Sequence, residues 1–139
     1  MYEVSFSSLS TRNFHRLFTL GEIVTPEQGE LLIEKGRRTD SLYLVIDGEF
    51  QVVLESDQKR AIGKGGFIGE LSFISGEVAS ADVSPLVRGS KILCWDKLTL
   101  VRFLDKDPVL SNAFDLIISS DVANKLKRMT VDSRLPEPI

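Results

Sequence analysis

The sequence is poor in the side chains that most often carry catalysis and bind metals. Its 139 residues include one histidine and one cysteine. A lone His15 excludes the histidine-rich metal centres of jelly-roll metalloenzymes, and His15 and Cys94 lack the sequence partners of a nucleophilic site. One cysteine also excludes a disulfide framework. We therefore expect no catalytic residue, no metal ligand and no cofactor.

The sequence also lacks an excess of positive charge and any long apolar run. Its formal net charge is -3, whereas a non-specific hold on nucleic acid depends on surplus Lys and Arg. We expect no nucleic-acid partner. No window reaches the roughly 18 apolar residues of a membrane span. The expected location is the cytoplasm, either as a free protein or as the cytoplasmic domain of a membrane protein with its membrane segment upstream of this chain.

Residues 21 to 95 predict a β-roll. Short apolar segments there are separated by Gly, Asp, Ser or Pro, which is typical of closely spaced strands. Seven or eight strands indicate a β-sandwich or jelly roll. Asp47-Gly48 predicts a tight hairpin with a fixed register. The expected strands cover 22–28, 30–36, 41–48, 49–56, 59–66, 79–85 and 91–95.

Apolar residues at helical spacing predict helices on both sides of the roll, at about 9–20 and about 96–129. The length of the chain predicts one domain over residues 1–139. Ser10 or Thr11 is the expected cap of the first helix, and Asp96 and Asp107 cap the later ones. The second helix places Leu98, Val101 and Leu104 on one face. The last carries an apolar stripe that either packs on the roll or forms a dimer seam: Val109, Leu110, Ala113, Phe114, Ile117, Ile118, Val122, Leu126 and Met129.

The stretch GGFIGELSFISGEVASADV, residues 65–83, combines glycines, a carboxylate and small residues, but it contains no Lys or Arg. It predicts one turn of helix after a glycine loop, where backbone N–H groups favour an anion. Glu70 can accept a hydrogen bond from a sugar hydroxyl, or it is a solvated glutamate stabilised by the helix dipole.

The order of LFTLGEIVTPEQGELLIEKGRRTDSLYLVIDGEFQVV and GGFIGELSFISGEVASADV resembles the cyclic nucleotide-binding domain family over roughly residues 9–129. The resemblance implies a mainly β fold with flanking α-helices, a double-stranded β-helix or jelly roll. It implies that Glu70 holds the ribose 2'-hydroxyl, that Ala79 occupies the position of the family's phosphate-binding arginine, and that Ser80 matches its small hydroxyl residue. The implied ligand-binding residues are Gly69, Glu70, Leu71, Ser72, Ala79, Ser80 and Ala81.

The segment KILCWDKLTLVRFLDKDPVLSNAFDLIISSDVANKL, residues 91–126, is similar to the corresponding part of Popeye-domain proteins. Those proteins carry a cyclic nucleotide-binding-like domain behind membrane spans and also lack the usual arginine. Their own cassette has a different acidic sequence, whereas this chain keeps Gly-Glu-Leu. The resemblance therefore implies a bacterial-looking relative between the two patterns.

Two functions follow from these patterns. The first is a non-enzymatic regulatory or sensory domain that binds cyclic AMP or cyclic GMP, with the phosphate on the backbone N–H groups of residues 70–72 and on Ser80. We expect the loop with Ala79 to be exposed and the helix from Val109 to move over the pocket. The second is a ligand-free interaction or dimerisation module of a membrane-associated protein, with a homodimer through the C-terminal helix.

Overall fold

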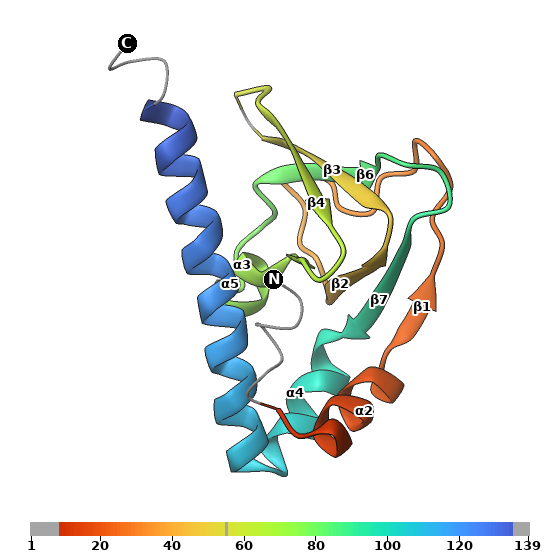
Figure 1. Cartoon of the computed structure of the whole chain (residues 1–139), viewed down its shortest axis with the longest axis vertical. Helices are drawn as coiled ribbons and strands as arrows, with labels where there is room; N and C mark the ends of the chain where they lie inside the picture. Colours follow the sequence, from red (N-terminus) through yellow and green to blue (C-terminus); the bar gives the residue numbers. More distant parts are fainter. Residues whose placement is uncertain (1–8, 55, 135–139) are drawn as a thin grey trace.

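The computed structural model describes residues 9–54 and 56–134, with side chains as far as Lys125. Two antiparallel sheets form a roll, and helices lie along one side and one end of it (Figure 1). This confirms the mainly β fold with flanking helices. One sheet has the order β1 (Glu22–Val24), β7 (Lys91–Asp96), β2 (Ser41–Asp47), β5 (Phe67–Ile68), and the other β4 (Lys59–Gly63), β3 (Glu49–Leu54), β6 (Ala81–Pro85). The helices are α2 (Thr11–Leu20), α3 (Glu70–Ser75), α4 (Lys97–Asp105) and α5 (Pro108–Arg134).

The central strand β2 divides the core because its side chains are buried on both faces. Leu42 and Leu44 face the helices, while Tyr43 and Val45 face the second sheet. Such alternation is the period-2 geometry of a strand covered on both sides. The site described below lies where these two parts of the core meet at β5.

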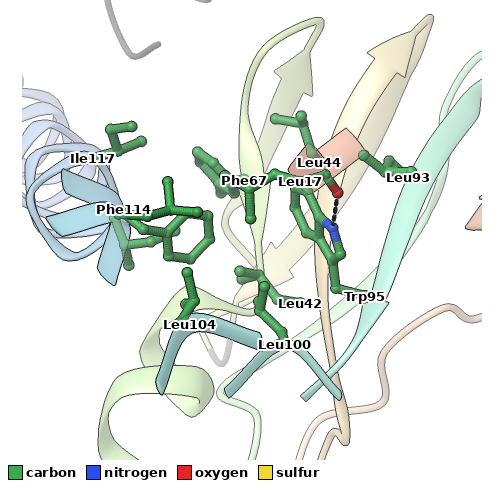
Figure 2. Packing of buried hydrophobic residues seen from close by; sticks show 12 residues of the cluster. Leu17, Leu42, Leu44, Phe67, Leu93, Trp95, Leu100, Leu104, Phe114 and Ile117 are labelled. Carbon is green, nitrogen blue, oxygen red and sulfur yellow. Dashed lines mark hydrogen bonds between the residues drawn. The ribbon is translucent and has the colours of Figure 1, made fainter. Parts of the chain in front are cut away.

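An aromatic group joins the roll to the helices (Figure 2). Phe67 stacks against Trp95 at 6.4 Å between ring centroids, and Phe114 of α5 packs edge-on against both. The indole Nε1–H of Trp95 donates a 2.7 Å hydrogen bond to the backbone oxygen of Leu17 in α2. Because a buried indole N–H needs an acceptor, this bond fixes α2 against the end of β7.

The expected helix caps are confirmed. Ser10 accepts from the backbone N–H of Asn13 at 3.1 Å, Asp96 from that of Thr99 at 3.0 Å, and Asp107 from that of Leu110 at 3.1 Å.

The three leucine and valine residues that the sequence places on one face of α4 are not all buried. Leu98 and Val101 are exposed, and Leu100 pairs with Leu104 against the core instead. Asp96 is both the last residue of β7 and the N-cap of α4, so no loop separates the strand from the helix. This direct connection turns Leu100 rather than Leu98 toward the core.

Two predictions for the strands are also wrong. Within the described residues, 30–36 forms only an isolated bridge between Ile33 and Val83, because Gly29 and Gly36 take positive φ and keep this segment irregular. Asp47-Gly48 is not a hairpin, since β2 and β3 belong to different sheets. Gly48 has φ +79, and Ser90 Oγ bonds the backbone N–H and oxygen of Glu49 there. The turn therefore carries the chain from one sheet to the other.

Helix α5 packs on the roll with Leu110, Phe114, Ile117 and Ile118 buried. This supports packing on the roll as the role of that part of the stripe. Val109 is 78% exposed, so it does not belong to the buried face. The predicted stripe residues Leu126 and Met129 lie beyond the described side chains. No helix in the described part of the chain is both long and apolar enough to span a membrane.

Candidate functional site

The segment from Gly69 to Ala81, called the cassette below, begins with a helix turn between two glycines. Gly69 has φ +87 and precedes α3, and Gly76 has φ +76 and ends it. A Cβ at Gly69 would lie 3.3 Å from the backbone oxygen of Ser41. Only glycine fits this conformation and this close approach easily. The predicted turn of helix after a glycine loop is confirmed.

Glu70 follows Gly69 and points into the protein rather than into solvent. Its side chain is 7% exposed, so it is not the solvated helix-start glutamate of the alternative interpretation. Glu70 Oε2 lies 2.5 Å from Lys125 Nζ of α5, and Lys125 also donates to the backbone oxygen of Phe67. Asp121 Oδ2, one helical turn before Lys125, lies 3.2 Å from the same ammonium. The cassette is thus joined to α5 by a buried charged cluster.

This cluster holds two carboxyl groups and one ammonium. The pKa of Glu70 is raised from 4.5 to about 7, chiefly because burial disfavours the charged carboxylate. A hydrogen bond with Asp121 also raises the pKa, while the charge of Lys125 acts against both. Burial wins over the ion pair, so Glu70 carries a proton in part of the molecules at neutral pH.

The other cassette residues divide between the core and the surface. Ser72 is buried, whereas Leu71 is 52% exposed and Ser80 is exposed. Ala79 and Ala81 are buried, at 9% and 8% exposure. The expectation of an exposed position for Ala79 is therefore wrong.

The physical reason is the backbone around Ala79. Its N–H donates to the oxygen of Arg37 and its own oxygen accepts from Gly36, both at 2.8 Å. The side chain packs in the same part of the core as Ile33 and Tyr43. The polar residues 75–77 form a turn before this pairing, so their exposure does not extend to Ala79.

A cavity of about 280 Å³ lies beside the cassette, lined by 31–34, 37–40 and Tyr43. Ile33 and Tyr43 border both this cavity and Gly69, where a Cβ would be 3.6 and 3.8 Å from their side chains. Burial raises the pKa of the Tyr43 phenol, which keeps it a neutral hydrogen-bonding group. Arg38 Nη1 donates a 2.8 Å bond to the backbone oxygen of Gly76.

The sequence did not predict the role of Lys125 or Asp121, although it contained a signal. The buried face of α5 continues from Ile117 and Ile118 to Asp121 and Lys125 at spacings of three and four. A change from apolar to paired charges along one buried face indicates a polar partner opposite. That partner is Glu70, which lies 55 residues before Lys125 in the sequence.

Two antiparallel sheets, flanking helices and a glycine-bounded helical turn with a buried glutamate define the class of the cyclic nucleotide-binding roll. The model of the cyclic nucleotide-binding domain family matches residues 23–107, and this chain belongs to that family. A solved cyclic nucleotide-binding domain from Methylobacillus flagellatus superimposes with a TM-score of 0.81, at 22% identity, over 98% of this chain and 81% of that one.

Curated relatives are larger proteins. A cGMP-dependent protein kinase from Plasmodium berghei is 22% identical over 129 residues, which are 91% of this chain and 15% of the kinase. A protein that carries the name of a potassium channel, from Rhodopseudomonas palustris, is 22% identical over 130 residues, 91% of this chain and 31% of its own. The chain thus spans less than a third of either relative.

Proposed function

We propose that this chain is a non-enzymatic sensory domain that binds a cyclic nucleotide at the cassette. The observation that carries the proposal is Glu70, a buried acceptor that follows the left-handed Gly69; two residues beside Gly69, Ile33 and Tyr43, line the neighbouring cavity. A buried carboxyl group accepts a hydroxyl well, because its removal from water strengthens the hydrogen bond. Glu70 then holds the ribose 2'-hydroxyl, as family membership suggests.

The phosphate is held without the usual arginine. Ala79 offers no charge, and the remaining groups are Ser80 and the first backbone N–H groups of α3. A hydrogen bond to a charged group contributes about 1.5–3 kcal/mol, so the lost arginine weakens binding by roughly 10- to 150-fold. We expect a weak site, in the range that calorimetry reaches with millimolar nucleotide.

Calorimetry with cyclic AMP, cyclic GMP and 2'-deoxy cyclic AMP tests the proposal. The deoxy analogue should bind about tenfold more weakly than cyclic AMP to the wild type, because the hydroxyl on Glu70 is missing. That difference should vanish in Glu70→Ala, which removes the acceptor, and persist in Glu77→Ala, an exposed glutamate of the same segment. No heat from any nucleotide, or an undiminished difference in Glu70→Ala, would refute the proposal.

A second candidate function is an interaction module that forms a homodimer through α5. Val109 and Leu116, seven residues apart on the outer face of α5, are 78% and 67% exposed. Apolar side chains at heptad spacing suit a helix-to-helix seam. Sedimentation of the wild type and of Val109→Glu/Leu116→Glu tests this function: a dimer that the substitutions convert to monomer supports it, and a monomeric wild type refutes it.

We propose the kind of larger protein that this domain regulates from the size of its relatives. A chain that matches a minor part of a kinase and of a named channel suits a cytoplasmic regulatory domain, and the Popeye-like pattern of residues 91–126 suits one attached to a membrane segment. Both arrangements use the same site, so the calorimetric test does not depend on the choice between them.

A further inference from the structure

Arg60 is a positively charged residue on the inner face of the roll. It lies in β4 and pairs with Val52 of β3, which pairs in turn with Val83 of β6. Directly opposite residues of antiparallel strands point to the same face of a sheet. Val83 is buried in the core between the two sheets, and Val52 packs against that core. Arg60 therefore points into the roll, and its Nε and Nη2 atoms are buried.

The other described residues on this face of the sheet are apolar. Alternation along the three strands places the following residues inward: Phe50, Val52, Leu54, Ile62, Ala81, Val83 and Pro85. The neighbours of Arg60 in β4, Lys59 and Ala61, are exposed on the outer face. Among its described residues, the sheet thus presents one cation to the interior of the roll.

The cassette meets this interior with small, uncharged side chains. Ala81 is buried and pairs with Leu54, two residues along β3 from Val52, and Ala79 is buried in the same part of the core. With about 4.8 Å between strands and about 3.4 Å per residue, roughly 12 Å separates the Cα atoms of Arg60 and Ala81. One arginine side chain, one phosphate group and the hydrogen bonds on either side of the phosphate span such a gap.

Three other cations near the cassette are placed less well to meet a phosphate inside the roll. Lys64 is exposed. Arg38 is exposed and donates to the backbone oxygen of Gly76. Lys125 lies against two carboxyl groups. Of these four cations, only Arg60 reaches the interior from the sheet itself, at the opposite edge from the strand that continues the cassette.

We propose that Arg60 supplies the positive charge that the cassette lacks, so that a bound cyclic phosphate lies between Arg60 and the alanine side of the cassette. The inference rests on the proposed function and specifies the part of the site that holds the phosphate. A guanidinium donates from a planar fork, so it can contact two phosphate oxygens. Arg60 thereby offsets part of the affinity lost at Ala79. The ligand class is a nucleotide with an anionic phosphate rather than a neutral nucleoside.

Calorimetry with cyclic AMP, cyclic GMP and adenosine tests this role of Arg60. Arg60→Met keeps a long side chain without the charge, and it should weaken the binding of both cyclic nucleotides by about tenfold or more, as expected for the loss of one hydrogen bond to a charged group. Adenosine has no phosphate and should bind the wild type and Arg60→Met with the same affinity. Lys59→Met is the matched control, because Lys59 precedes Arg60 in β4 and is exposed on the outer face.

A double-variant cycle separates contact with the phosphate from support of the fold. Ala79→Arg places a second guanidinium on the cassette side, so Arg60→Met should weaken binding less in the Ala79→Arg background than in the wild type. A purely structural role of Arg60 would give the same loss in both backgrounds. Arg60→Lys keeps the charge and loses the fork. It should weaken both cyclic nucleotides about threefold and leave adenosine unaffected, and it serves if Arg60→Met does not fold.

The outcomes separate the two proposals. A cyclic nucleotide that binds the wild type and Arg60→Met equally overturns the role of Arg60 and leaves the proposed function standing. A loss for cyclic GMP alone means that Arg60 meets the guanine base, whose O6 and N7 accept from arginine, and this overturns the assignment to the phosphate. Equal losses in the two Ala79 backgrounds, or an equal loss for adenosine, overturn it as well. Absence of binding to the wild type, at millimolar nucleotide, overturns the proposed function and this inference with it.

Discussion

Because the pKa of Glu70 is raised, the fold should lose stability as the pH rises. The carboxylate of an ordinary ion pair has a lowered pKa and gives the opposite dependence. The folded pKa of about 7 lies above the unfolded value of 4.5. Each pKa unit corresponds to 1.36 kcal/mol, so ionised Glu70 costs about 3 kcal/mol of folding free energy. The sign follows from the raised pKa. The stabilising contribution is fully present below pH 4.5 and is lost as the pH rises through 7.

Urea unfolding of the wild type and of Glu70→Gln between pH 4.5 and 8.5 isolates this effect. Glutamine cannot ionise and leaves Lys125 paired with Asp121. The unfolding free energy of the wild type, relative to Glu70→Gln, should fall by about 3 kcal/mol across the range. Subtraction of the two curves cancels the titrations of groups that do not interact with Glu70, and Glu77→Gln controls for the loss of one exposed carboxylate.

The result decides between burial and the ion pair. The carboxyl groups of Glu70 and Asp121 face each other and the Lys125 ammonium, so a dominant ion pair would lower the pKa of Glu70 instead. The wild type would then gain stability over Glu70→Gln as the pH rises from the lowered pKa to about 4.5, and the difference would stay nearly level above that. A flat or rising difference curve contradicts the reasoning.

Four further substitutions test the fold and the cassette. In urea titrations, Gly48→Ala should lower the unfolding free energy by about 3 kcal/mol, and Gly36→Ala should lower it by about 1 kcal/mol. Both glycines have positive φ, but only at Gly48 would the added Cβ clash with a neighbour, Ser90 Oγ at 2.2 Å. Equal losses in the two variants would contradict this explanation. Trp95→Phe should cost about 2–3 kcal/mol, since it removes a buried indole and its hydrogen bond, and a loss below 1 would argue against that bond. Ala79→Arg should cost about 1–3 kcal/mol of stability at a buried site while strengthening nucleotide binding about tenfold, and weaker nucleotide binding in the folded variant would place the phosphate elsewhere.

The sequence predicts correctly those features that depend on only a few neighbouring residues, such as helix caps. The caps at Ser10, Asp96 and Asp107 are as expected because a cap depends on one side chain and the next three backbone N–H groups. Asp47-Gly48 was recognised as a turn but not as a change of sheet. The sequence of a turn fixes its φ angles, whereas the sheet that the next strand joins depends on contacts such as Ser90, 41 residues from Glu49.

The candidate site divides in the same way. The left-handed Gly69 and the short helix after it follow from the local sequence, and the structure has both. The burial of Ala79 depends on pairing with residues 36 and 37, and the ion pair of Glu70 depends on Lys125. Both are long-range contacts, and neither has a counterpart in the composition of 65–83. The roles of Gly69, Glu70, Leu71, Ser72, Ala79, Ser80 and Ala81 in ligand binding stay predictions.

The charges around the cassette come from two distant parts of the chain. Residues 67–83 contain no Lys or Arg, so the cation that meets Glu70 comes from α5. The cassette itself offers an anion only Ser80 and backbone N–H groups. Its buried glutamate therefore depends on α5 for a compensating charge, and the packing of that helix on the roll sets the electrostatics of the site.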